Sequence, residues 1–181
     1  MKLWGTFASL LFASVSLAQP LDLAGNPRNP FANAARVRIL LFVRADCPIT
    51  NRYAPELQRL AEKFTEPGVE FWLVYPDRTA TPAAIKDHVA QYRFPGEPLR
   101  DPRHELVKRA HATITPEAAV FDASGRLVYH GRIDDRWVEI GKARAEARTH
   151  DLEDSIAAVL AGKPVARAET RAVGCTLADL E

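Results

Sequence analysis

Two short runs of nearly continuous apolar residues constrain the fold of this chain more than any other feature. Val37–Val43 reads VRILLFV and Val69–Tyr75 reads VEFWLVY. Such runs are typical of strands that are covered on both faces. Between them, Leu57, Leu60 and Phe64 fall at helical spacing. Because parallel strands need a crossover connection, a helix between two buried strands predicts a parallel sheet.

Proline, threonine and aspartate mark where the predicted helices begin or bend. Pro48 suits the first turn of the helix after the first strand, and Pro55 inside that helix should kink it. Thr81 and Pro82 form an N-cap and first-position pair, and Asp151 can start the last helix. The other expected elements are a strand at 98–101, a brief helix at 104–111, and strands at 118–121 and 127–129. This order predicts a single-domain α/β fold: a mixed central sheet, helices on both faces, and a C-terminal β-hairpin plus helix.

The N-terminus has the pattern of a secretory signal peptide. Lys2 is followed by an apolar stretch, 3–17, and Ser16 and Ala18 place small residues at the two positions that a signal peptidase reads. We therefore expect cleavage after Ala18 and a periplasmic or secreted protein. The alternative is a membrane anchor, although the stretch is short for a span of about 20 residues. No membrane span is expected once the signal peptide is removed.

Charge and ligand spacing argue against several classes of function. The net charge is +1 and no dense basic run occurs, so nucleic acid and anionic membranes are not expected as partners. No His or Cys pair has zinc-ligand spacing, so no metal site is expected. A copper carrier would need two neighbouring cysteines and a histidine, which this sequence does not place together.

Cys47 is the residue best placed for chemistry. It follows the first strand and opens a helix, where free N–H groups and the helix dipole stabilise a thiolate and lower the thiol pKa. Arg44 and Arg52 would add to this effect, and Asp46 would oppose it. A thiolate is the nucleophile in disulfide exchange and in peroxide reduction.

The segment around Cys47 resembles the active site of thioredoxin-like redoxins. Residues 45–55 read ADCPITNRYAP, and Pro55 stands five residues after Thr50, as a proline does after the second cysteine of a thioredoxin Cys-x-x-Cys. The chain is most similar to exported redoxin-domain proteins of the alkyl hydroperoxide reductase and thiol-specific antioxidant (AhpC/TSA) family. The resemblance covers about residues 36–162 and implies a thioredoxin-like fold for them. It leaves 19–35 as an extended lead-in and 163–181 as a tail.

A second similarity lies just before the strand at 118–121. Thr115 and Pro116 match the position where thioredoxin-like proteins carry a cis-proline that faces the active-site sulfur and helps bind a partner peptide. The resemblance therefore implies that Thr115 and Pro116 bind substrate. In isolation, Pro116 reads as an ordinary proline before a strand.

The sequence also departs from the patterns of this family. Thr50 replaces the second cysteine, so dithiol exchange inside the motif is excluded. A peroxiredoxin would carry Thr three residues and Pro seven residues before its reactive cysteine, where Arg44 and Leu40 stand here. Thr50 is a candidate donor to the Cys47 thiolate, or else a first-turn residue that satisfies local backbone.

Cys175, the second of only two cysteines, is the candidate to replace the missing thiol. An extended tail of this length can span about 45 Å, which is enough to reach Cys47. An even number of cysteines in an exported protein favours a disulfide. The bond then either forms when Cys175 resolves a catalytic intermediate, or is a permanent cross-link that stabilises the fold by about 4 to 5 kcal/mol. A third alternative leaves both thiols free, with Cys47 acting alone.

These observations lead to one favoured function and one rival. The favoured function is an exported thiol redox protein that exchanges disulfides, or reduces hydroperoxides, with Cys47, Cys175 and Thr50 as catalytic residues. Its substrates would be protein thiols and disulfides, a small thiol or a hydroperoxide, with an external thiol reductant and no cofactor. The rival is a non-catalytic binding module with a structural Cys47–Cys175 disulfide. Two charged stretches, 129–135 and 142–148, are expected to be a solvated turn and a solvated helix or loop.

Overall fold

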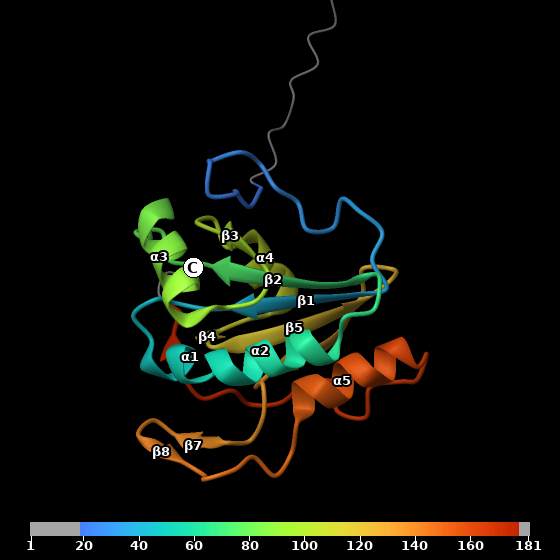
Figure 1. Ribbon diagram of the computed structural model, residues 1–181. Helices are drawn as coiled ribbons and strands as arrows, with labels where there is room; N and C mark the ends of the chain where they lie inside the picture. Colours follow the sequence, from blue (N-terminus) through green and yellow to red (C-terminus); the bar gives the residue numbers. More distant parts are fainter. Residues whose placement is uncertain (1–18, 178–181) are drawn as a thin grey trace, which may run out of the picture.

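The computed structural model describes residues 19–177, and its centre is a five-stranded mixed sheet (Figure 1). The strands lie in the order β3-β2-β1-β5-β6. β1 is parallel to β2 and β2 to β3, whereas β5 is antiparallel to β1 and β6 to β5. The strands are β1 Val37–Phe42, β2 Val69–Tyr75, β3 Glu97–Arg100, β5 Glu117–Asp122 and β6 Leu127–Gly131. The predicted fold is confirmed; the predicted signal peptide, 1–18, lies outside the described residues.

Within residues 19–177, five helices cover the two faces of this sheet. They are α1 Pro48–Arg52, α2 Ala54–Lys63, α3 Pro82–Tyr92, α4 Glu105–Ala110 and α5 Asp151–Leu160. Ile39 and Leu41 of β1 belong to the core with α2, α3 and α5, and Leu40 and Phe42 belong to the core with α4. Figure 1 accordingly shows α2 and α5 in front of the sheet and α4 behind it. Both faces of β1 are buried, which explains its unbroken apolar sequence.

The helix after β1 is broken rather than kinked. α1 ends at Arg52 and α2 begins at Ala54, with Pro55 in the first turn of α2. Tyr53 between them donates its N–H to the carbonyls of Ile49 (3.2 Å) and Thr50 (3.0 Å). A proline lacks an N–H and clashes with the preceding turn, so the chain restarts its helix at this point.

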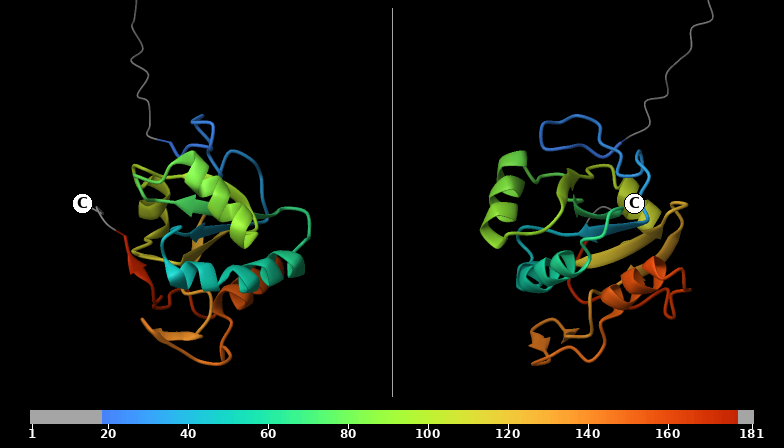
Figure 2. Two further views of the ribbon diagram at one scale, coloured as in Figure 1. Left: turned by 60° about the vertical axis from the view of Figure 1, so that its left-hand side comes forward. Right: turned by 45° about the vertical axis from the view of Figure 1, so that its right-hand side comes forward.

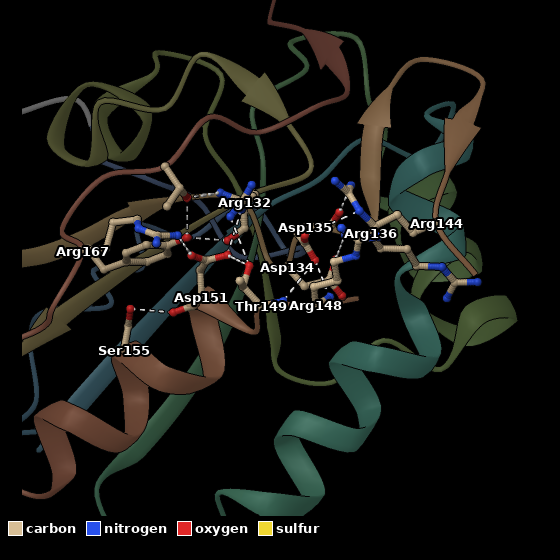
Figure 3. A network of polar contacts seen from close by, with 12 residues as sticks. Arg132, Asp134, Asp135, Arg136, Arg144, Arg148, Thr149, Asp151, Ser155 and Arg167 are labelled. Atoms are coloured by element: carbon tan, nitrogen blue, oxygen red, sulfur yellow. Dashed lines mark hydrogen bonds and ion pairs between the residues drawn. The ribbon is translucent and has the colours of Figure 1, made fainter. Parts of the chain in front are cut away.

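The loop from β6 to α5 differs most from the sequence prediction. The expected solvated turn at 129–135 is wrong, because Asp134 and Asp135 are both buried. Figure 3 shows their network: Arg132 binds Asp151 at 2.8 Å, and Asp135 accepts the N–H of Thr149 at 3.1 Å. Several partners of these charges lie far along the chain, such as Asp151 for Arg132 and Thr149 for Asp135, and a local charge pattern does not reveal them. The loop is therefore fixed, and Asp134 ties it to the α1–α2 junction through the Tyr53 hydroxyl at 2.6 Å.

Two further features lie at the periphery. β7 (Trp137–Glu139) and β8 (Lys142–Ala143) form a small hairpin where a helix or loop was expected from residue 142 onward. The lead-in makes turns and pairs Leu21 with Arg100 at the outer edge of β3. Across residues 19–177, no helix combines the length and apolar character that a membrane span requires.

The C-terminal tail returns to the side of the sheet where α1 begins. Near its end the tail forms β9 (Cys175–Thr176), which pairs antiparallel with β4 (Ile114–Thr115) in a separate two-stranded sheet. Figures 1 and 2 show this tail in red, passing below the central sheet and ending beside β4. The tail thus brings residues from the end of the chain to the start of the first helix.

Candidate active site

Cys47 is the N-cap residue of α1 and ends the short loop that follows β1. Its backbone is extended (φ −91°, ψ 110°), and its carbonyl accepts the N–H of Asn51 at 3.2 Å. Its side chain is fully buried, at 0% exposure, and its Sγ donates to the Thr115 carbonyl at 3.3 Å. The sequence-predicted position at the start of a helix is therefore correct, and the sulfur faces the segment before Pro116.

Cys175 covers this buried sulfur. In the β4–β9 pair Cys175 stands opposite Thr115, and its Sγ lies 2.7 Å from the Sγ of Cys47. Cys175 itself is partly exposed. The structure therefore brings together two cysteines that are 128 residues apart, close enough to exchange a disulfide bond with little movement.

Thr115 and Pro116 form the wall against which both cysteines lie. The Thr115–Pro116 peptide bond is cis, as the resemblance implied. The Thr115 carbonyl accepts a hydrogen bond from the Cys47 thiol, and the Thr115 hydroxyl donates to the Cys175 carbonyl at 3.3 Å. Glu117, which the sequence reasoning missed, accepts the N–H groups of Thr113 (2.9 Å) and Ile114 (3.2 Å) and so holds β4 in place.

Thr50 lies one turn along α1 from Cys47. It is fully buried, and its hydroxyl has no hydrogen-bond partner in the described part of the chain. A buried hydroxyl without a hydrogen-bond partner destabilises the folded state, and this hydroxyl is free to donate a hydrogen bond. The hydroxyl makes no hydrogen bond to local backbone among the described residues, and its donation to a thiolate at Cys47 stays a prediction.

The similarity to known proteins agrees with this arrangement. The AhpC/TSA family profile matches residues 20–130, which is more than half of the chain. The chain belongs to the AhpC/TSA family. The matched stretch of this family includes Cys47, Thr50, Thr115 and Pro116 and ends before Cys175, so the tail sulfur lies outside the part that the family profile matches. No match is found among curated proteins.

Solved structures support the fold of this AhpC/TSA protein. A hypothetical protein from Sinorhizobium meliloti 1021 is 24% identical, with a TM-score of 0.73 over 88% of this chain and 90% of that chain. A secreted disulfide oxidoreductase of Mycobacterium tuberculosis is 18% identical (TM-score 0.53; 79% and 93% covered). A thioredoxin-like protein from Aeropyrum pernix is 16% identical (TM-score 0.55; 80% and 89% covered). At these identities the comparison shows a thioredoxin-like fold.

Burial and hydrogen bonds shift the pKa values of the two thiols of this AhpC/TSA protein in opposite directions. Burial opposes ionisation of Cys47, but the Cys175 thiol, the N–H groups of Thr50 and Ile49 and the nearby Thr50 hydroxyl hold the pKa of its thiol below the ordinary value. Burial and the neighbouring Cys47 sulfur raise the pKa of the Cys175 thiol. Of the two thiols, Cys47 is therefore the more readily ionised.

The nearby charges have a smaller role than the sequence suggested. Arg44 pairs with Asp46 at 2.8 Å, and the two act in opposite directions on the Cys175 pKa. Arg52 lies over the ring of Trp137, 5.6 Å from its centroid. Neither arginine makes a hydrogen bond to either sulfur, so these charges are secondary to the donors around Cys47.

A partly buried chain of polar contacts supports the loop before Cys47 and was not found by sequence reasoning. Asn51 donates to the Ala45 carbonyl at 3.3 Å, and its side-chain oxygen lies 2.7 Å from Nε2 of His88. The other nitrogen of His88 lies 2.8 Å from the Tyr75 hydroxyl. Burial lowers the pKa of His88, which favours a neutral ring that donates from Nε2 to Asn51 and accepts the Tyr75 O–H at Nδ1. His88 carries no sequence signal beyond its place on the inner face of α3.

One group among residues 19–177 has the residue types of a metal site. Possible ligand atoms of Glu56, His150 and Glu153 lie within 4.8 Å of one another. Arg59 binds both carboxylates, and Lys63 also binds Glu153. Because these cations already neutralise the carboxylates, the group is better described as an ion-pair cluster between α2 and α5.

Proposed function

We propose that this protein is an exported thiol–disulfide oxidoreductase in which Cys47 and Cys175 alternate between a dithiol and an internal disulfide. One observation carries the proposal: the two sulfurs lie 2.7 Å apart, held there by the β4–β9 pair. The lowered pKa of Cys47 beside the raised pKa of Cys175 supports distinct roles for them. The signal-peptide pattern at 1–18 supports export to an oxidising compartment.

The reaction takes two exchange steps. The Cys47 thiolate attacks one sulfur of a substrate disulfide, forms a mixed disulfide and releases the other half of the substrate as a thiol. Cys175 then loses its proton and attacks the Cys47 sulfur, which forms the internal disulfide and releases the second thiol. The substrate gains two electrons and the protein loses two, so an external thiol reductant must restore the dithiol.

The surrounding residues have supporting roles in this scheme. The Thr50 hydroxyl donates to the Cys47 thiolate, because no other partner for it is present among the described residues. Thr115 and Pro116 orient the substrate sulfur, because the Thr115 carbonyl already faces Cys47 at 3.3 Å. A reductant would attack Cys175, the more exposed sulfur, with Cys47 as the better leaving group because its pKa is lower.

Hydroperoxide reduction is a second candidate, which family membership favours. The Cys47 thiolate would attack one peroxide oxygen, break the O–O bond, release the alcohol and become a sulfenic acid. Cys175 would then condense with it to form the internal disulfide and water, and an external thiol would reduce that disulfide. Arg44 and Leu40 stand where a peroxiredoxin carries Thr and Pro, which weighs against this candidate. The test is hydroperoxide consumption by the reduced protein, with Cys47→Ser as the blank.

The deciding experiment is the reduction potential of the Cys47–Cys175 pair in glutathione and dithiothreitol series, read by thiol trapping and mass spectrometry. A reversible bond between about −120 and −270 mV is expected of an exchange enzyme. A bond below about −300 mV, whose reduction also lowers thermal stability, would instead indicate a stapled binding domain. The Cys47→Ser and Cys175→Ser proteins serve as controls, because neither can form the internal bond.

A further inference from the structure

The tail strand β9 fills the edge beside the buried nucleophile. Cys175 stands opposite Thr115, the Leu177 N–H donates to the Thr113 carbonyl at 3.1 Å, and the Thr115 hydroxyl donates to the Cys175 carbonyl at 3.3 Å. Beneath this strand Cys47 has 0% exposure. While β9 is in place, no external disulfide can reach the Cys47 sulfur, so β9 must leave before Cys47 reacts.

The tail is held by two separate sets of contacts. The first set lies before β9: Arg167 binds Asp151 at 2.8 Å, and the Thr170 N–H donates to the His130 carbonyl at 3.2 Å. The second set is β9 itself. Arg171, between the two, is exposed. Ala172 and Val173 also pack between the two sets, so the end of the tail lifts from β4 by releasing these contacts and those of β9, while the first set keeps it attached nearby.

The contacts of β9 specify which residues fit this edge. A Cβ on Gly174 would stand 2.0 Å from the Thr115 carbonyl oxygen, so the residue before the cysteine must be glycine for this approach. Thr176 points to solvent and is exposed. Leu177 is 5% exposed and packs in the core with Phe42 and Leu106. The edge of β4 therefore accommodates a segment with the pattern Gly-Cys-x-Leu.

We propose that β4, once β9 has lifted, binds an extended cysteine segment of a partner protein that carries glycine just before the cysteine and an aliphatic residue two positions after it. The inference rests on the proposed function and names its substrate class. The tail occupies the site as an internal copy of this substrate. Cys47 attacks the cysteine sulfur of the segment in its disulfide and expels the other half as a thiol. The tail then returns, and Cys175 attacks Cys47 and releases the segment as a thiol.

The test uses the full-length Cys175→Ser protein, in which the mixed disulfide on Cys47 cannot be resolved. The probes are the peptide acetyl-Ala-Val-Gly-Cys-Thr-Leu-amide and two matched peptides, one with Val for Gly and one with Glu for Leu. Each is activated as its mixed disulfide with thionitrobenzoate. We expect the first peptide to release thionitrobenzoate about tenfold faster than either control, with the peptide found on Cys47 by mass spectrometry. Equal rates for the three peptides would overturn the proposal.

Two outcomes distinguish failure of the docking proposal from failure of the proposed function. If Cys47 reacts with a plain aromatic disulfide but does not discriminate between the peptides, only the docking proposal fails. If Cys47 reacts with none of these disulfides, the proposed function fails as well. The additional change Gly174→Val, which cannot keep β9 on β4, should raise the rates with all three peptides; unchanged rates would show that β9 does not control access.

A second copy of the chain carries the same tail sequence and is the competing occupant. Mixing the Cys47→Ser and Cys175→Ser proteins with an oxidant tests it directly. We expect few heterodimers, because the contacts of Arg167 and Thr170 keep each tail beside its own β4. Efficient Cys47–Cys175 heterodimers, formed in preference to the peptide adduct, would assign the edge to a neighbouring copy and overturn the proposal.

Discussion

Gly174 approaches Thr115 so closely that a Cβ on Gly174 would stand 2.0 Å from the Thr115 carbonyl oxygen. Cβ atoms do not approach other atoms to that distance, so the backbones of β4 and β9 can meet in this register only with glycine at 174. The next residue, Cys175, owes its position over Cys47 to this contact. A residue without chemistry of its own therefore determines whether the two sulfurs meet.

Replacing Gly174 with Ala should weaken the internal disulfide. The added methyl group forces β9 away from Thr115, which lowers the effective concentration of Cys175 at Cys47. We expect the equilibrium constant for the disulfide against glutathione to fall by about tenfold, equivalent to about 1.4 kcal/mol. Thr176→Ala is the matched control, because Thr176 lies on the same strand and is exposed. An unchanged constant in Gly174→Ala would show that β9 tolerates a side chain there.

Replacing Thr50 with Val should separate reactivity from stability. Valine keeps the shape but removes a buried hydroxyl that has no partner among residues 19–177, so the free energy of unfolding should not fall. The pKa of Cys47 should rise, because Thr50 is one of the groups that lower it. Alkylation of Cys47 at neutral pH, measured in a Cys175→Ala background, should therefore slow several-fold. Thr50→Ser restores the hydroxyl and should restore the rate; equal rates in all three proteins would remove Thr50 from the site.

The sequence predicted β1, β2 and the position of Cys47 better than it predicted the tail strand β9. Continuous apolar runs identified β1 and β2, and the place of Cys47 between β1 and α1 followed from them. The position of β9 had no such signal. A two-residue strand has no periodicity, and its place depends on distant contacts, such as Gly131 against the Thr170 carbonyl and Gly174 against Thr115.

The failures around the loop from β6 to α5 have a similar cause. Asp134 and Asp135 look like solvated charges when only their neighbours in sequence are considered. Their partners, Tyr53 and Thr149, are placed by the fold, and the buried carboxylates follow from that placement. Local charge patterns describe burial only where the partner is also local.

Glu117 should control the position of β4 without contacting substrate. Its carboxylate accepts the N–H groups of Thr113 and Ile114, and Glu117→Ala would leave both without that partner. We expect a loss of about 1 to 3 kcal/mol in urea unfolding and slower formation of the internal disulfide. Glu117→Gln keeps an acceptor oxygen and should recover most of both properties. Normal disulfide formation in Glu117→Ala would show that β4 needs no such support.

Asp151 should make the stability of the protein depend on pH in the acid range. Burial opposes its ionisation, but hydrogen bonds from Arg132 and Thr149 and the charge of Arg167 hold the pKa of its carboxyl below the ordinary value. A lowered pKa in the folded state contributes stability above the unfolded pKa of about 3.9, and that contribution is lost as the pH falls through the folded pKa. Asp151→Asn should therefore be less stable by about 1 to 3 kcal/mol at pH 7 and lose less stability on acidification. Urea unfolding at a series of pH values measures both effects.

The control for this prediction is Asp154→Asn, because Asp154 is an exposed acid in the same turn of α5. If Asp154→Asn loses as much stability as Asp151→Asn, the network around Arg132 does not stabilise the loop.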